Sequence, residues 1–323
     1  MNLERFRTMA QQLQENVGKV IVGKNDVVEL FIIAMTASGH ILLEDVPGTG
    51  KTLLAKTMAK SLDCQFKRVQ FTPDLMPSDL SGIHYFNQKT SEFEFREGPI
   101  FTNVLLADEI NRATPRSQSS LLECMEERQV SIDGHTFVLE RPFFVIATQN
   151  PIENQGTFPL PEAQLDRFIM KIRMGYPDTQ QFIEILDRFK ERQPLNEITK
   201  VATKEDIVAG QDLCRKVAVS APVMEYLVAV LERTRSHADV AMGVSPRGGQ
   251  ALLKTIQIRA ALRGRDYVMP DDIKALSPHV LAHRLVLRDE IERDSNTAEG
   301  IIASILNEIP VPTEARLQEA AGG

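Results

Sequence analysis

Hydrophobic and polar positions follow two different periods along the first 177 residues. Short apolar runs typical of buried strands occur in HILLED, NVLLADE, FFVIATQN and FIMKIRM, and FKRVQF alternates as a half-buried strand does. Between these runs, NDVVELFIIAMTASG and KTLLAKTMAKSL carry apolar residues at helical spacing. Short apolar strands that alternate with helices predict a parallel sheet covered by helices on both faces.

Two segments interrupt this rhythm, and both predict hairpins. In the segment from about 83 to 98, aromatic residues alternate with charged ones in SEFEFREG. In the segment from about 128 to 141, Asp133 and Gly134 lie between two alternating runs. An Asp-Gly pair permits a tight primed turn, so we expect a hairpin in each segment.

The pattern changes after residue 177, where strand signals give way to amphipathic helices. Thr203 and Asp206 have the spacing of a capping box, and Ser220 and Ser245 stand where helix N-caps are expected. The sequence therefore predicts an αβ domain in residues 1–177 and an all-helical domain in residues 178–323.

Composition and charge narrow the class of protein. The chain has 323 residues, 43% of them apolar, and a net charge of −7, which does not favour binding to nucleic acid or an anionic membrane. Its three cysteines form no CxxC pair, and no apolar run approaches the roughly 20 residues that span a bilayer. The polar start does not resemble a signal peptide. These features predict a soluble, cytoplasmic protein with no stable membrane insertion.

The stretch LLEDVPGTGKTLLAK resembles a phosphate-binding loop with an unusual first residue. The pattern G-x-x-x-x-G-K-[ST] fits Gly50, Lys51 and Thr52, but Asp45 occupies its first position. Backbone amides and a helix N-terminus bind phosphate, so the loop can function if the Asp45 carboxylate points away from the anion. A glycine-rich turn without a ligand is the alternative. The expected nucleotide contacts are Pro47, Gly48, Thr49, Gly50, Lys51, Thr52 and Leu53.

An acidic pair ends another apolar run. Asp108 and Glu109 close VLLADE, at the predicted end of a strand. We expect Asp108 to join Thr52 in the Mg²⁺ shell and Glu109 to orient the attacking water. The alternative is two solvated carboxylates, which the nearby phosphate loop makes less favoured.

Four motifs together resemble the MoxR family of AAA+ ATPases, in its helix-2-insert clade. They are VPGTGKT, LLADEINRA, ATQNPIENQGTFPLPEAQLDRF and GVSPRGGQALLK, and the resemblance covers about residues 20–278. It implies a P-loop αβα domain with strand order 5-1-4-3-2 and a helical lid. It also implies a homo-oligomeric ring, commonly a hexamer, with ATP or ADP and Mg²⁺ between neighbours. The two hairpins match the family's helix-2 insert and pre-sensor-1 hairpin.

The resemblance also assigns roles to single residues. It places Asn150 at the sensor-1 position, with Gln149 as the near alternative, and Arg247 at the sensor-2 position on the lid, acting in cis or in trans. In the segment VIVGK, it implies that Val22 and Gly23 contact adenine.

Arg167, in LDRF, stands at the arginine-finger position of the family. The resemblance implies that it reaches the ATP of a neighbouring subunit and stabilises charge in the transition state. The alternative is an ion pair with Asp166 or Glu162.

The implied function is a chaperone-like ATPase that remodels or matures partners, with proteins bearing von Willebrand factor A domains as the expected class. Three alternatives stay open at this point. They are a nucleotide-gated scaffold with little turnover, a chelatase-like subunit and a nucleic-acid motor, the last disfavoured by the negative charge.

Overall fold

A parallel sheet forms the centre of the computed structural model, which describes residues 1–46, 48–150, 156–191, 193–288 and 297–312. Within these residues the sheet has five strands in the order β2-β5-β8-β1-β9, and every pairing is parallel. If these five strands are renumbered 1 to 5 in chain order, their order counted from the β9 edge is 5-1-4-3-2. The predicted strand order is therefore confirmed. The strands are β1 (Ile41–Glu44), β2 (Phe66–Gln70), β5 (Val104–Asp108), β8 (Phe144–Gln149) and β9 (Met170–Ile172).

Alternate residues of the central strands pack against helices on opposite faces. Ile41 and Leu43 of β1 belong to one apolar cluster, together with Phe31 and Leu54. Leu42 belongs to a second cluster on the other face. The first cluster includes α1 (Leu3–Gly18), α2 (Asn25–Thr36) and α3 (Lys51–Ser61), and the second includes α5 (Pro115–Glu127). Burial on both faces explains why these strands read as continuous apolar runs.

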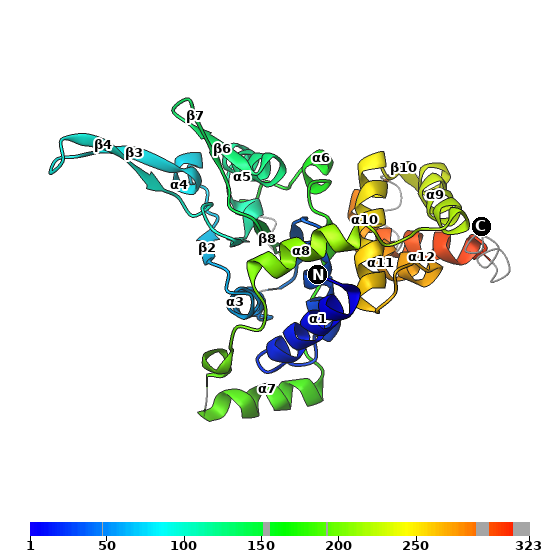
Figure 1. Ribbon diagram of the computed structural model, residues 1–323. Helices are drawn as coiled ribbons and strands as arrows, with labels where there is room; N and C mark the ends of the chain where they lie inside the picture. Colours follow the sequence, from blue (N-terminus) through cyan, green and yellow to red (C-terminus); the bar gives the residue numbers. More distant parts are fainter. Residues whose placement is uncertain (47, 151–155, 192, 289–296, 313–323) are drawn as a thin grey trace.

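Both predicted hairpins are present. The first consists of β3 (Gly82–Asn87) and β4 (Glu92–Glu97), preceded by α4 (Pro77–Ser81), and the second of β6 (Gln129–Ile132) and β7 (His135–Val138). Asp133 and Gly134 have φ of 51° and 82°, as a primed turn requires. Figure 1 shows both hairpins projecting from the same side of the molecule.

The C-terminal region is mostly helical, as predicted, but not entirely. The Thr203 capping box is present and Ser245 accepts a bond from the Gly248 amide. Ser220 is the N-cap residue of α9, as expected, although its side chain makes no cap hydrogen bond. The all-helical expectation was wrong, because β10 (Val240–Met242) pairs with β11 (Val286–Leu287), and strands this short leave no readable alternation. The helices are α8 (Lys204–Cys214), α9 (Ala221–Ser236), α10 (Pro246–Leu262), α11 (Pro270–Leu281) and α12 (Ala298–Glu308).

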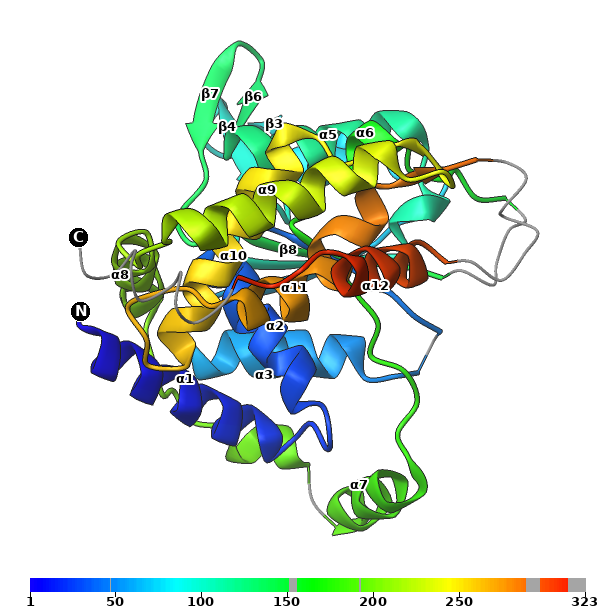
Figure 2. The same cartoon turned by 90° about the vertical axis from the view of Figure 1, so that its right-hand side faces the viewer.

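The two regions share one apolar core. Phe6 of α1 and Phe31 of α2 belong to the same buried cluster as Ile256 of α10. A boundary at residue 178 therefore does not coincide with a gap in the core, and the domain limits stay a prediction. Figure 2 shows α7 (Thr179–Glu191), which follows that boundary, at the periphery of the molecule, and its Arg188 donates to the carbonyl oxygen of Gly18 at the end of α1. The short elements are α6 (Glu162–Leu165), η1 (Ile110–Arg112), η2 (Pro194–Glu197) and η3 (Ala282–Arg284).

Candidate nucleotide-binding site

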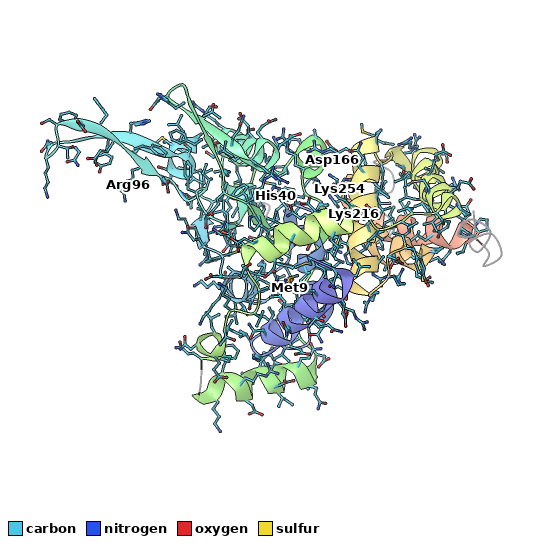
Figure 3. All side chains as sticks on the ribbon, viewed as in Figure 1. Met9, His40, Arg96, Asp166, Lys216 and Lys254 are labelled. Atoms are coloured by element: carbon cyan, nitrogen blue, oxygen red, sulfur yellow. The ribbon has the colours of Figure 1, made fainter. Side chains whose placement is uncertain are left out.

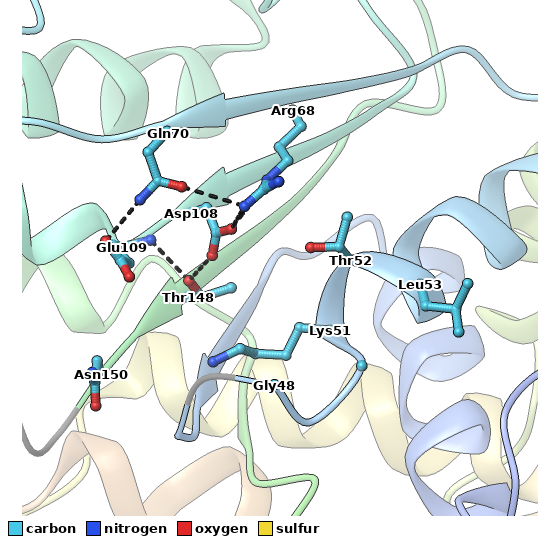
Figure 4. A pocket seen from close by; sticks show the side chains of 11 residues that line it. Gly48, Lys51, Thr52, Leu53, Arg68, Gln70, Asp108, Glu109, Thr148 and Asn150 are labelled. Carbon is cyan, nitrogen blue, oxygen red and sulfur yellow. Dashed lines mark hydrogen bonds and ion pairs between the residues drawn. The ribbon is translucent and has the colours of Figure 1, made fainter. Parts of the chain in front are cut away.

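The carboxyl ends of β1, β5 and β8 meet at one edge of the sheet, and a cavity of about 390 Å³ opens there. Parallel α/β sheets bind ligands at this edge, because the loops after the strands converge on it. The side chains around the cavity come from β2, β5, β8 and the start of α3 (Figure 4). The lining residues are Gly48, Gly50, Lys51, Thr52, Leu53, Arg68, Gln70, Asp108, Glu109, Thr148 and Asn150.

The phosphate loop lies at one wall of this cavity. Gly48 and Gly50 have φ of 86° and 89°, a backbone conformation that favours glycine. Lys51 begins α3, and its Nζ donates to the carbonyl oxygen of Asp45 at 2.8 Å. Burial lowers the pKa of Lys51, and the nearby carboxylates of Asp45, Asp108 and Glu109 oppose that shift. The ammonium is thus held at the loop by carbonyl oxygens that a phosphate oxygen could replace.

Two of the predicted loop residues differ from the rest. Thr49 does not line the cavity, and its hydroxyl donates to the carbonyl oxygen of Val46 at 3.3 Å. Pro47 lies outside the described residues. The other five residues line the cavity, and their contact with a nucleotide stays a prediction.

The Asp45 carboxylate points away from the cavity, which meets the condition that the sequence set for a working loop. Its Oδ2 accepts hydrogen bonds from the amides of Met174 and Gly175 at 3.0 and 2.9 Å. Its Oδ1 accepts one from the amide of Val46 at 2.9 Å. The side chain therefore ties the start of the loop to the segment after β9, and its negative charge is stabilised by backbone amides outside the cavity.

The acidic pair lies across the cavity from the loop. Asp108 accepts hydrogen bonds from the Thr148 hydroxyl at 2.6 Å and from Arg68 Nε at 3.1 Å. Glu109 Oε2 accepts a bond from Gln70 Nε2 at 2.7 Å, and its amide donates to Thr148 at 2.8 Å. Glu109 has φ of 56°, so the strand ends between the two acids and their carboxylates engage different partners.

Three residues of this constellation were not predicted from the sequence. Arg68 and Gln70 lie two apart on β2 and so share a face, and Gln70 is the register partner of Asp108. Their alternation in FKRVQF was visible, but the identity of the neighbouring strand was not. Thr148 lies two residues before Asn150 in the same apolar run, and it bridges both acids.

Asn150, rather than Gln149, reaches the cavity. Asn150 follows the last residue of β8, lines the cavity and is 7% exposed. Gln149 ends the strand and is not among the lining residues. Of the two candidates that the sequence left open, Asn150 is the one that lines the cavity, and its sensor-1 role stays a prediction.

Arg167 and Arg247 do not line the cavity. Both form ion pairs with Glu126 of α5, through Arg167 Nη1 at 2.7 Å and Arg247 Nη1 at 3.1 Å. Arg167 also donates to the carbonyl oxygen of Leu122 at 2.9 Å. One carboxylate near the end of α5 thus contacts both arginines, one before β9 and one at the start of α10.

The expected alternative partners of Arg167 were wrong. Asp166 instead accepts a bond from Arg284 Nε at 2.6 Å, and no ion pair of Glu162 is present among the described residues. Arg284 is almost fully buried, and burial lowers its pKa while Asp166 opposes the shift. The adjacent acid is therefore taken by a different arginine, and Arg167 turns to α5.

Val22 and Gly23 do not line this cavity either. Val22 is buried, and Gly23 has φ of 68°. A Cβ at Gly23 would lie 2.3 Å from Cδ of Gln181 on α7, so this link packs closely against α7. Their contact with adenine stays a prediction.

The oxygen-rich part of the cavity suits Mg²⁺. Thr52 offers one hydroxyl and Asp108 one carboxylate. The Asp108 carboxylate also forms an ion pair with Arg68. Among the described residues, no group of three His, Cys, Asp or Glu side chains could hold a metal ion. Mg²⁺ is commonly held by one or two carboxylates together with substrate phosphates, so the donor set fits a metal that arrives with a nucleotide.

Comparison with known proteins agrees with this geometry. Residues 40–170 match the ATPase family associated with various cellular activities, and residues 232–305 match an AAA lid domain. The protein YeaC of Bacillus subtilis is 49% identical over 93% of this chain and 94% of its own length. Chaperone MoxR1 of Mycobacterium tuberculosis is 41% identical over 92% of this chain and 80% of its own length.

A solved structure from Cytophaga hutchinsonii, described as an ATPase, has a TM-score of 0.91 and 38% identity. The match covers 96% of this chain and 97% of that one. In the described part of this chain, no helix has the length and apolar character needed to cross a membrane. The fold, the phosphate loop and these relatives lead to one conclusion: the chain belongs to the MoxR family of AAA+ ATPases.

Proposed function

We propose that this protein binds ATP with Mg²⁺ in the cavity at the sheet edge and hydrolyses it to ADP. The observation that carries the proposal is the placement of Lys51 opposite Asp108 and Glu109 across one cavity, with Asp45 turned out of it. The loop amides and the start of α3 would bind the phosphates. Bound Mg²⁺, held by Thr52 and Asp108, would neutralise charge that develops on the transferred phosphate.

In this proposal Glu109 accepts a proton from the attacking water or orients it. The Gln70 amide donates to Glu109 at 2.7 Å and so leaves a second carboxylate oxygen for water. Asn150 would donate to the γ-phosphate or the water from the opposite wall. General-base groups of this kind contribute about 10²–10⁴ in rate.

We place the ATP between subunits of a homo-oligomeric ring, with a hexamer as the expected size. Supporting this, Arg167 and Arg247 are absent from the cavity of their own chain and gather at Glu126. An arginine that cannot contact its own nucleotide in this arrangement is available to a neighbour's. Arg167 is the proposed finger, and Arg247 the proposed sensor 2.

The proposed role of hydrolysis is chaperone-like remodelling or maturation of partner proteins in the cytoplasm. The relative named Chaperone MoxR1 supports this role. The projecting hairpins, with Phe93 74% and Val138 77% exposed, offer apolar side chains to such a partner. Proteins with von Willebrand factor A domains are the proposed class.

Replacement of Glu109 by Gln tests both the reaction and the partner. We expect steady-state turnover to fall by about 10²-fold or more, while the Kd for ATP changes by less than about threefold, because only the proton acceptor is lost. Glu123→Gln, an exposed acid on α5, is the matched control. Unchanged turnover in Glu109→Gln would contradict the assigned reaction. In pull-downs with ATP, this slow variant should retain the partner longer than the wild-type chain does.

A further inference from the structure

A second polar cavity lies where the helical region meets the ATPase core. Its volume is about 110 Å³, and its walls come from the ends of α2 and α8, from α10 and from Arg128 at the end of α5. Three cationic side chains line it, and no acidic side chain does: Arg128, Arg215 and Lys254. Lys254 is marked in Figure 3. The nucleotide cavity shares no lining residue with it.

Carboxylates do not balance this positive charge. Burial lowers the pKa of Arg128, and its positive neighbours Arg141 and Arg215 lower it further. Arg215 forms an ion pair with Asp212 at 3.7 Å, but both side chains are more than 70% exposed, where such pairs contribute little. The lining thiol of Cys214 has its pKa raised to about 12 by burial, so it stays neutral.

Helix ends offer a competing explanation for the cations. α2, α5 and α8 end at this place, and a helix C-terminus carries about half of a negative elementary charge. Arg128 Nη2 accordingly donates to the carbonyl oxygen of Ser38 at 2.7 Å. Three half charges offset only about half of three full positive charges. A positive excess therefore remains, and it is partly screened because Arg215 and Lys254 are solvent-exposed.

A buried hydroxyl provides an independent sign of a missing ligand. Thr36 lines the cavity, is 2% exposed, and its Oγ1 has no hydrogen-bond partner among the described residues. Beside it, Gln211 is 9% exposed and donates to the carbonyl oxygen of Met35 at 3.4 Å, a long bond. Buried polar groups in native proteins are normally paired, so an orphaned hydroxyl among cations calls for an acceptor.

We propose that this cavity binds the oxyanion of a phosphate group, supplied either as inorganic phosphate or as a phosphomonoester. Arg128, Arg215 and Lys254 supply the charge, and the Thr36 hydroxyl donates one hydrogen bond. Guanidinium groups match phosphate oxygens in pairs, and the cavity admits a group of that size.

Binding there would join elements that the nucleotide cavity does not contact. α8 and α10 belong to the helical region, and α2 to the core. Arg128 directly precedes the β6–β7 hairpin. A phosphate group would therefore fix the base of that hairpin relative to the helical region. The site does not depend on the proposed ATP hydrolysis.

Titration calorimetry with inorganic phosphate and with phenyl phosphate tests the proposal. The full chain carries Lys51→Ala, so that the nucleotide cavity contributes little. We expect saturable binding below about 10 mM, which the double variant Arg215→Gln, Lys254→Gln weakens at least about tenfold. The matched control is Lys89→Gln, Arg96→Gln, which removes the same charge from the β3–β4 hairpin. No saturable binding, or equal weakening in both variants, would overturn the site.

A second variant separates the ligand contact from folding. Thr36→Val replaces the orphaned hydroxyl by a methyl of similar shape, so the phosphate-free chain should be as stable as the wild type or more stable. Phosphate binding should weaken by about threefold to tenfold. A less stable Thr36→Val chain in urea unfolding would show that the hydroxyl already has a partner and would refute the proposal. Tighter binding of phenyl phosphate than of inorganic phosphate would identify a phosphomonoester as the ligand, and the reverse would identify the free anion.

Discussion

The nucleotide cavity and the cluster of Glu126, Arg167 and Arg247 both contain cationic and acidic side chains, but only the cavity leaves space between them. In the cavity, Lys51 at the start of α3 and the two acids Asp108 and Glu109 at the end of β5 converge on open space. At Glu126, two arginines converge on one carboxylate of their own chain, at 2.7 and 3.1 Å. The first arrangement is ready to receive a ligand. The second is closed by an internal partner, so its arginines need a competing anion before they can act elsewhere.

This difference separates the groups for ATP hydrolysis that a single chain already brings together from those that it does not. The cavity offers a phosphate cradle, a metal-binding acid and a candidate base from a single chain. Arg167 and Arg247, which we expect to stabilise the transition state, are instead paired with Glu126, where α5 meets the start of α10. Because the Glu126 pairs are 30–48% exposed, they are weak enough to be exchanged for contacts with a phosphate.

The largest expected effect comes from disabling the phosphate loop and the arginine in different subunits. Arg167→Ala and Lys51→Ala should each lower turnover severely, the first by about 10³–10⁵ if it is a finger. Mixed subunits should regain turnover, because one variant supplies a working cavity and the other a working arginine at the same interface. ATPase assays across mixing ratios measure this. Inactivity at every ratio would refute a finger that acts in trans.

A smaller effect, on stability, concerns His40, which links the sheet to α5. His40 directly precedes β1 and is 3% exposed. Its Nδ1 accepts a hydrogen bond from the Val145 amide and its Nε2 donates to the Met125 carbonyl oxygen, both at 3.0 Å. Burial lowers its pKa to about 4. Since the unfolded chain binds the proton more readily, this stabilisation is complete above about pH 6.5 and is lost as pH falls towards 4.

From pH 7 to 4.5, the wild-type chain should lose about 2–3 kcal/mol more unfolding free energy than His40→Gln does, measured in urea. His135→Gln, at an exposed hairpin position, should keep the wild-type pH dependence. Identical slopes in all three chains would show that His40 is not the titrating group. Met125 adjoins Glu126, so loss of this bond should also loosen the arginine cluster.

The smallest expected effect comes from removing the charge of Glu126, which pairs with both arginines. Glu126→Gln removes the competing charge, so apparent ATP affinity should rise by about twofold to fivefold, with a stability change below about 1 kcal/mol. Glu127→Gln, the exposed neighbour on α5, is the control. Nucleotide titration of both variants measures the change. Weaker ATP binding in Glu126→Gln would mean that Glu126 positions the arginines for use instead of storing them.

The parts of the site predicted from the sequence are those with local signals. Glycine spacing, a lysine at a helix start and an acidic pair at a strand end each depend on a few consecutive residues. Arg68, Gln70 and Thr148 were missed because they reach the site through pairing between strands far apart in the chain. The same reason explains why Glu126 was not foreseen as the partner of Arg167.

Local sequence patterns were enough to predict the alternation of helix and strand, the two hairpins and the phosphate loop. These follow from hydrophobic period, turn residues and backbone chemistry that act over short stretches. Three features came from the fold alone: Glu126 contacts both arginines, three cations line the same cavity as Thr36, and the Asp45 carboxylate bonds to the segment after β9. Such contacts depend on which helix ends and strand ends packing brings together, and no local pattern records that choice.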